Sequence, residues 1–229
     1  MNTLKITLYD NKLKNNFQLG MTRLLEVPCY DDMFFAYLIT LGGGLVDKDM
    51  YELDFELLNS KAYLSSQSNQ KIYKGKQKLN TKITLNNSSL IFHNDANIFY
   101  EDANFNSTST IYFDSLSKFI YIDGGFIGYS KAKFKANLRL KLFINYKLIF
   151  NDNFIYENIN SLLSNLNYEY FYNLILNENI DIKEIFNENI IITHSNINNI
   201  LIVRILSNSN DLAMSYINDI KQEFLLKQS

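Results

Sequence analysis

The sequence has few of the residues on which metal sites and disulfide frameworks depend. Its 229 residues include one cysteine, two histidines, one proline and no tryptophan. A single cysteine, Cys29, excludes a disulfide within the chain. A closed structural zinc site is also excluded, because neither histidine stands at a recognised ligand spacing from the other or from Cys29. An excess of charge of one sign is lacking too, since the formal net charge is −2. The charge balance therefore gives no indication of a nucleic-acid-binding surface.

Long hydrophobic runs are also absent. The longest, residues 33–41, has nine residues with the polar Thr40 among them, whereas a membrane helix needs roughly 18. The first 16 residues alternate apolar and polar side chains and carry charges throughout, so they contain no apolar core of a signal peptide. These absences predict a cytoplasmic protein that does not insert into a membrane.

Alternation with a period of two dominates the first two thirds of the chain and predicts β-strands. Leu4, Ile6 and Leu8 alternate with polar residues, and the segment 51–57 alternates Tyr, Leu and Phe with Glu and Asp. We read Asp123-Gly124-Gly125 as a turn. Many short strands separated by turn signals indicate a sandwich, barrel or stacked β architecture, and the length favours one domain over residues 1–229. The other predicted strands cover residues 33–40, 62–66, 71–74, 79–85, 90–92, 98–100, 108–113, 133–144 and 147–155.

The pattern changes near residue 157. Residues 157–176 are ambiguous between helix and strand, and two β-branched strands, 190–192 and 200–203, flank a polar turn at residues 195–199. The last segment predicts a helix, because Asn208 or Ser209 can cap it. Its apolar residues then recur at helical spacing on one face, namely Leu212, Tyr216, Ile217, Ile220 and Phe224. The expected fold is therefore mainly β with a few helices, one of them at the C-terminus.

The sequence contains no recognised catalytic motif. The glycine-rich segment 42–46 lacks phosphate-loop spacing, and Lys48 is followed by Asp49 where a phosphate loop requires Ser or Thr. We interpret it as a sharp turn or bulge that glycine permits between two strands. No G-x-S-x-G motif supports a hydrolase.

Two polar segments remain open to more than one interpretation. His93 and Asp95, with Glu101 and Asp102 nearby, can offer a transient site for a borderline cation such as nickel. An exposed polar turn is the interpretation we favour there. Residues 65–74 are rich in amides and hydroxyls, and they can form an ordinary strand edge, the lining of a polar channel or a partner surface.

Three blocks together resemble the UreD/UreH family of urease accessory proteins. The turn GGGLVDKD resembles the family's GGLVGGD, with matches at Gly43, Gly44 and Asp49 among others. Asp47 and Lys48 stand where the family has two glycines. The segment LSSQSNQKIYKG resembles LTTQAATKVYRS, with identities at Gln67, Lys71 and Tyr73. The third block is the closing strand with Arg204 and the final helix.

The resemblance implies a non-catalytic scaffold with a β-helix-like stack of strands. It further implies a UreF-type partner, a UreG-type GTPase reached through that partner, apo-urease as the target, and an internal polar tunnel for nickel. No cofactor would be bound stably, and nickel only transiently. Gly43, Gly44, Asp49, Gln67, Lys71, Tyr73 and Arg204 are then the candidates for partner or tunnel contacts. A β-rich module that binds a ligand or carbohydrate is the alternative.

Overall fold

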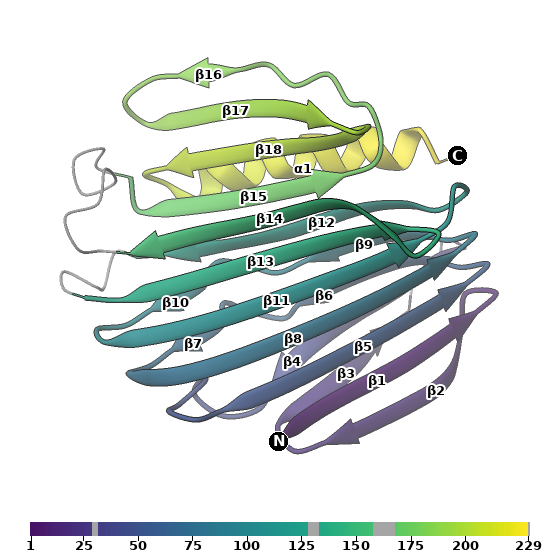
Figure 1. Ribbon diagram of the computed structural model, residues 1–229, viewed down its shortest axis with the longest axis horizontal. Helices are drawn as coiled ribbons and strands as arrows, with labels where there is room; N and C mark the ends of the chain where they lie inside the picture. Colours follow the sequence, from purple (N-terminus) through teal and green to yellow (C-terminus); the bar gives the residue numbers. More distant parts are fainter. Residues whose placement is uncertain (29–31, 128–132, 158–167, 229) are drawn as a thin grey trace.

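Two facing β-sheets and one C-terminal helix make up the part of the chain that the computed structural model describes, residues 1–28, 32–127, 133–157 and 168–228 (Figure 1). The seven-stranded sheet has the order β14-β13-β11-β8-β5-β1-β2. The eleven-stranded sheet has the order β16-β17-β18-β15-β12-β9-β6-β4-β3, with β10 paired to β12 and β7. The strands of the seven-stranded sheet are β1 (Asn2–Tyr9), β2 (Lys12–Leu19), β5 (Met50–Leu58), β8 (Gly75–Asn86), β11 (Ala103–Phe113), β13 (Lys135–Ile144) and β14 (Lys147–Glu157).

The second sheet is built from shorter strands. It consists of β3 (Thr22–Val27), β4 (Phe34–Thr40), β6 (Lys61–Ser66), β7 (Lys71–Ile72), β9 (Ser89–His93), β10 (Asn97–Phe99), β12 (Lys118–Phe126), β15 (Tyr170–Leu176), β16 (Ile185–Phe186), β17 (Ile190–Ile197) and β18 (Ile200–Ser207).

The chain winds as a stack of coils. Each central coil runs through a long strand of the first sheet, then a strand of the second, and the equivalent strands of successive coils pair in parallel. The turns between the two sheets repeat as well. Ser60 N–H donates to Ser88 Oγ and Ser88 N–H donates to Ser117 Oγ, across separations of 28 and 29 residues. The predicted stacked β architecture is therefore confirmed.

A third, short row of strands closes one side of the coils. Leu45 pairs with Ile72 as an isolated bridge, and Ile72 pairs with Phe99 between β7 and β10. All three side chains are buried in one apolar cluster, at most 2% exposed. Residues 45 and 72 thus occupy equivalent positions in neighbouring coils, and the two separate sequence blocks become adjacent in space.

The C-terminal part adds antiparallel strands and helix α1 (Asn210–Leu226), which packs beside β15 and β18 (Figure 1). Ser209 caps this helix, as predicted, by accepting a hydrogen bond from Leu212 N–H. Residues 170–176 are a strand, whereas the rest of the ambiguous segment, residues 158–167, lies outside the described residues. Among the described residues no helix is long and apolar enough to cross a membrane.

One predicted turn is wrong. Asp123-Gly124-Gly125 lies inside strand β12 and is buried. A Cβ at Gly124 would overlap the ring of Tyr172, and one at Gly125 would overlap the ring of Phe171. These glycines let two aromatic side chains of β15 pack against β12, a reason that depends on residues almost 50 positions away.

Candidate functional site

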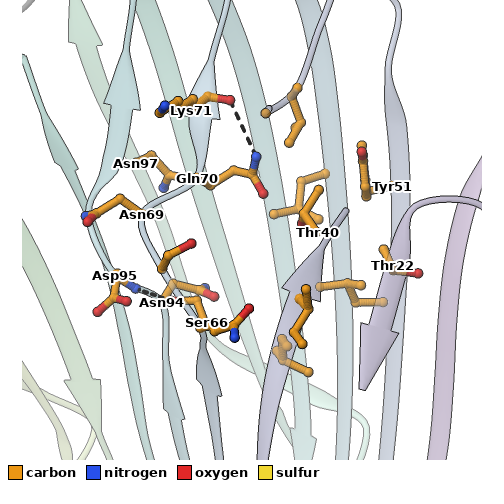
Figure 2. Close-up of a pocket in the computed structure, with 18 of the residues that line it drawn as sticks. Thr22, Thr40, Tyr51, Ser66, Asn69, Gln70, Lys71, Asn94, Asp95 and Asn97 are labelled. Atoms are coloured by element: carbon orange, nitrogen blue, oxygen red, sulfur yellow. Dashed lines mark hydrogen bonds between the residues drawn. The ribbon is translucent and has the colours of Figure 1, made fainter. Parts of the chain in front are cut away.

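A cavity of about 250 Å³, lined by both polar and apolar side chains, lies between the two sheets. We call the exposed end of its lining the mouth, which includes the glycine turn, residues 42–45, and the polar segment, residues 66–71. Figure 2 labels Ser66, Asn69, Gln70 and Lys71 of the polar segment. The glycines at 42 and 43 and Gln67 are exposed there, whereas Ser107 and Asp123 at the other end of the lining are buried. The two family-like blocks therefore surround one opening.

The glycine turn is shaped by a close approach of backbone to backbone. Leu45 N–H donates to Lys71 O at 2.8 Å, and Tyr73 N–H donates to Leu45 O at 3.0 Å. Gly44 has φ +136°, and a Cβ there would stand 2.5 Å from Lys71 O and 3.0 Å from the Tyr73 ring. Glycine is required at this position because no other residue tolerates both the backbone angle and the contact.

The predicted site residues fall into two groups. Gly43, Gly44, Gln67 and Lys71 all line the cavity, although Lys71 has an exposed side chain. Tyr73 packs its ring against Gly44 and does not itself line the cavity.

Asp49 supports the turn from outside the cavity. Its carboxylate accepts a hydrogen bond from Val46 N–H at 2.9 Å. The two residues that replace the family's glycines are accommodated next to it. Lys48 adopts a positive φ of 68°, and Asp47 Oδ1 accepts from Lys76 N–H at 2.8 Å. The turn therefore keeps a left-handed backbone conformation at position 48 although the residue there is not a glycine.

Asp123 is the buried carboxylate of the cavity. It accepts hydrogen bonds from Gly124 N–H at 2.9 Å, from Asn97 Nδ2 at 3.3 Å and from Tyr121 Oη at 3.3 Å. Burial raises the pKa of Asp123 to about 6, with the three hydrogen bonds acting in the opposite direction. Asp123 is not among the site residues predicted from the sequence, because the segment 123–125 reads as a turn there. A carboxylate within the apolar run FIYID was the signal available.

Arg204 lies at a second polar site. Its Nη2 contacts Asp152 Oδ2 at 2.6 Å, its Nη1 donates to Asn173 Oδ1, and its guanidinium lies 5.1 Å from the centre of the Phe154 ring. Asp152 and Asn173 line a hollow of about 10 Å³ together with Asp123. Asp123 therefore belongs to both the large cavity and this hollow, and it connects Arg204's partners to the cavity.

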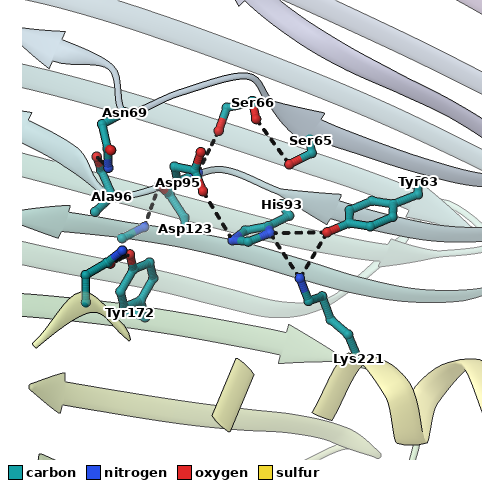
Figure 3. A network of polar contacts seen from close by, with 12 residues as sticks. Tyr63, Ser65, Ser66, Asn69, His93, Asp95, Ala96, Asp123, Tyr172 and Lys221 are labelled. Atoms are coloured by element: carbon teal, nitrogen blue, oxygen red, sulfur yellow. Dashed lines mark hydrogen bonds and ion pairs between the residues drawn. The ribbon is translucent and has the colours of Figure 1, made fainter. Parts of the chain in front are cut away.

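The segment around His93 is not the exposed turn that we favoured. His93 ends strand β9 and is only 3% exposed. Tyr63 Oη and Lys221 Nζ lie 3.5 and 3.4 Å from its Nδ1, and Asp95 Oδ1 lies 3.8 Å from its Nε2 (Figure 3). Burial, and then the charge of Lys221, lower the pKa of His93 to about 3, so its imidazole is neutral at physiological pH. Burial also raises the pKa of Asp95.

Lys221 was not foreseen as a site residue, although it lies on the inner face of α1 and is 9% exposed. Its spacing of four from Ile217, in an otherwise apolar stripe, was the available signal. Asp95 also lines the cavity, whereas Glu101 and Asp102 do not. No group of three or more His, Cys, Asp or Glu side chains able to hold a metal ion occurs in the described part of the chain.

These features define a class: a β-solenoid-like protein whose stacked coils enclose a cavity of mixed polar and apolar lining with a buried carboxylate. Comparison with protein families shows that residues 10–228 match the UreD urease accessory protein family. The match covers nearly the whole chain, so the chain belongs to the UreD family of urease accessory proteins. Comparison with curated proteins gives no significant match.

Proposed function

We propose that this protein is a scaffold that helps deliver nickel into apo-urease and has no catalytic residue of its own. It acts together with a UreF-type accessory protein and, through that partner, with a UreG-type GTPase. The observation that carries the proposal is a cavity with a buried carboxylate in a member of a urease accessory family. The two family-like blocks form the mouth of this cavity, and its interior holds the carboxylate of Asp123.

The cavity has suitable ligands for a transient passage of a divalent cation. Ser66, Asn97 and Ser107 offer hydroxyl and amide oxygens along the lining, and Asp95 and Asp123 offer carboxylates. From Asp123 the neighbouring hollow leads to Asp152. We infer a route that begins at Gln67, passes Asp123 and reaches Asp152. Lys71 contributes its backbone to the lining, since its side chain is exposed.

The rim of the mouth supports docking of a partner. Four exposed apolar residues adjoin lining residues in sequence or through backbone hydrogen bonds, namely Met21, Leu41, Val46 and Met50, each 39–53% exposed. Leu41 N–H donates to Met21 O at 2.7 Å, and Asn2 bonds to both Met21 N–H and Met50 O. Exposed apolar groups around an opening are typical of protein-protein contacts, and methionine is enriched in them. We assign this rim to the UreF-type partner.

Deleting the gene in its host tests the proposal. We expect urease to lose nickel-dependent activity and a UreF-type protein to copurify with the wild-type chain.

Gln67→Ala at the mouth should lower urease activation without unfolding the chain, whereas Lys82→Ala on an exposed part of β8 should leave activation unchanged. Full urease activity after the deletion would refute the proposal. A monomer that ignores the accessory proteins and shows a ligand-dependent shift in melting temperature would instead support a ligand-binding module.

A further inference from the structure

The turn between β13 and β14 carries a bulky side chain in an unusual backbone conformation. Asn145 and Tyr146 both have positive φ, 47° and 64°, and two-residue hairpin turns of this kind favour Asn followed by Gly. Ten non-glycine residues of the described chain have positive φ; eight of them are Asn or Asp, and Tyr146 is the only aromatic one. Its side chain is also 90% exposed. A strained residue whose ring lies in solvent indicates a role outside the packing of the chain.

Tyr146 ends a row of rings on the outward face of the seven-stranded sheet. The rings of Tyr112 in β11 and Phe143 in β13 are stacked with their centroids 4.9 Å apart, and the Tyr146 ring lies 6.4 Å from that of Tyr112. Leu148, the neighbour of Phe143 across the hairpin, is 49% exposed. We call these four residues the hairpin patch. Exposed apolar groups that gather in this way mark interaction sites.

Basic side chains continue the same face along β13. Arg139 and Lys141 precede the patch at two-residue spacing, so they point to the same side of the sheet. Neither β11 nor β13 contains Asp or Glu. On the neighbouring strand β14, Glu157 at the far end is paired with Lys135 Nζ at 2.5 Å. The surroundings of the patch are therefore positively charged, although the whole chain has a net charge of −2.

We propose that the hairpin patch, with Arg139 and Lys141, docks an acidic surface of apo-urease. The inference rests on the proposed function, which gives the scaffold a second protein to hold besides the UreF-type partner. Tyrosine and arginine are enriched among the side chains that dominate binding energy in protein interfaces. Stacked rings beside basic groups also suit single-stranded nucleic acid, but the exposed aliphatic side chain of Leu148 favours a protein.

The position of the patch allows both partners to bind at once. The rim of the mouth includes Met50, where β5 begins, whereas the hairpin patch lies where β13 ends. The two strands run in the same direction and are three strand spacings apart in the sheet (Figure 1). The length of a strand and these spacings separate the two corners by roughly 30 Å. Interfaces of standard size, about 800 Å² on each partner, then fit side by side.

The test measures binding of purified apo-urease, produced in the same host without nickel, to the complex of this chain with its UreF-type partner. Tyr146→Gly removes the ring and gives the turn its preferred sequence, so the melting temperature should equal or exceed that of the wild type. The same substitution should weaken binding of apo-urease about tenfold or more. A structural role for Tyr146 would instead lower the melting temperature.

Charge variants test the electrostatic part. Arg139→Glu should also weaken binding of apo-urease about tenfold, and added salt should weaken binding by the wild type. The control is Lys12→Glu, an equal change of charge at an exposed position of β2, on the other edge of the sheet. It should bind apo-urease as the wild type does. All three variants should retain the UreF-type partner, because the rim is unchanged.

The outcomes separate this inference from the proposed function. Wild-type binding of apo-urease by both Tyr146→Gly and Arg139→Glu would overturn the inference alone, provided that urease activity in the host still depends on this chain. Unchanged binding of apo-urease together with loss of binding to a poly(U) oligonucleotide in Tyr146→Gly would assign the patch to nucleic acid instead. Full urease activity without the chain would refute the proposed function.

Discussion

At the scale of single residues, Asp123 is a carboxylate held in an environment far from that of water. It lies in the middle of an apolar strand, and its partners are one backbone N–H, one amide and one phenol. Neutral donors of this kind only partly replace the hydration of a carboxylate, so burial still dominates and the pKa is about 6. A carboxylate that titrates near neutrality can hold a proton when no cation is present and release it when a cation arrives.

This raised pKa predicts how stability depends on pH. The folded protein binds a proton at Asp123 more tightly than the unfolded chain does, so the contribution of Asp123 is fully present below about pH 4 and is lost as pH rises through 6. The variant Asp123→Asn lacks this loss. Relative to wild type, it should therefore gain up to about 3 kcal/mol in free energy of unfolding between pH 4 and pH 7. Urea unfolding at both pH values measures the difference, and a pH-independent difference would contradict it.

The wild type must be compared with this variant because His93 changes the free energy of unfolding with pH in the opposite direction to Asp123. Its pKa is lowered to about 3, so its contribution is present above the unfolded pKa of roughly 6.5 and is lost as pH falls through 3. The two effects overlap between pH 4 and 6 and partly cancel in the wild-type curve. Subtracting the stability curve of Asp123→Asn from that of the wild type removes the histidine contribution, because both proteins contain His93.

At the scale of elements, the glycine turn and the short strand β7 form one unit across two coils. Their two backbone hydrogen bonds join Leu45 to Lys71 and to Tyr73. On the opposite side of the coils the serine turns do the same, through Ser60, Ser88 and Ser117. Each coil is therefore tied to the next at the turns as well as along the strands.

The glycine turn predicts different outcomes for two adjacent substitutions. Gly44→Ala places a Cβ 2.5 Å from Lys71 O at a φ of +136°, so it should lower the free energy of unfolding by about 2 kcal/mol or more. The Cβ of Gly43→Ala would meet only Tyr73 Oη, at an ordinary 3.7 Å. This substitution should change the free energy of unfolding by no more than about 0.5 kcal/mol. Urea unfolding of the two variants measures both changes. Equal losses of stability would show that the close approach of Gly44 to Lys71 does not determine the effect of the substitution.

Most of these elements could be predicted from the sequence, because the alternation of apolar and polar residues reports which side of each strand is buried. The strand at 51–57 follows from this alternation and extends by one residue at each end in the structure. The strand at 190–192, predicted from its β-branched residues, continues to Ile197 and so includes the first three residues of the turn predicted at 195–199. The local pattern failed at Asp123-Gly124-Gly125, where glycine makes room for the rings of β15. It also failed at His93, which is covered by a helix residue 128 positions later. Both errors concern contacts between distant segments, which a local pattern does not contain.

At the scale of the whole molecule, the stacking of coils explains why the cavity joins segments so far apart in sequence. Its lining extends from Leu4 in β1 to Asp123 in β12. The resemblance of two short blocks to the UreD family indicated the function, and the coil geometry explains why those blocks occur together. Neither block by itself indicated the interior carboxylate, since Asp123 comes from a third segment.

The apolar rim predicts a loss of partner binding without a loss of stability. Val46 is 53% exposed, and its hydrogen bonds, both with Asp49, use its backbone N–H and C=O and not its side chain. Val46→Asp should therefore leave the melting temperature within a few degrees of wild type and abolish copurification of the UreF-type partner. Leu148→Asp is the control and should retain the partner. Leu148 is 49% exposed and lies in β14, an edge strand of the seven-stranded sheet. Equal retention by both variants would move the docking surface elsewhere.

The hairpins at the two ends of the seven-stranded sheet have a consequence for self-association. Strands β1, β5, β8, β11 and β13 pair in parallel, but β2 and β14 pair antiparallel and form the edges. A second copy that approached either edge would meet a hairpin strand that runs opposite to the parallel stack. Lysines on these strands, at positions 12, 14 and 147, further discourage edge-to-edge pairing. A repetitive β fold of this type thus has built-in protection against growing into fibres.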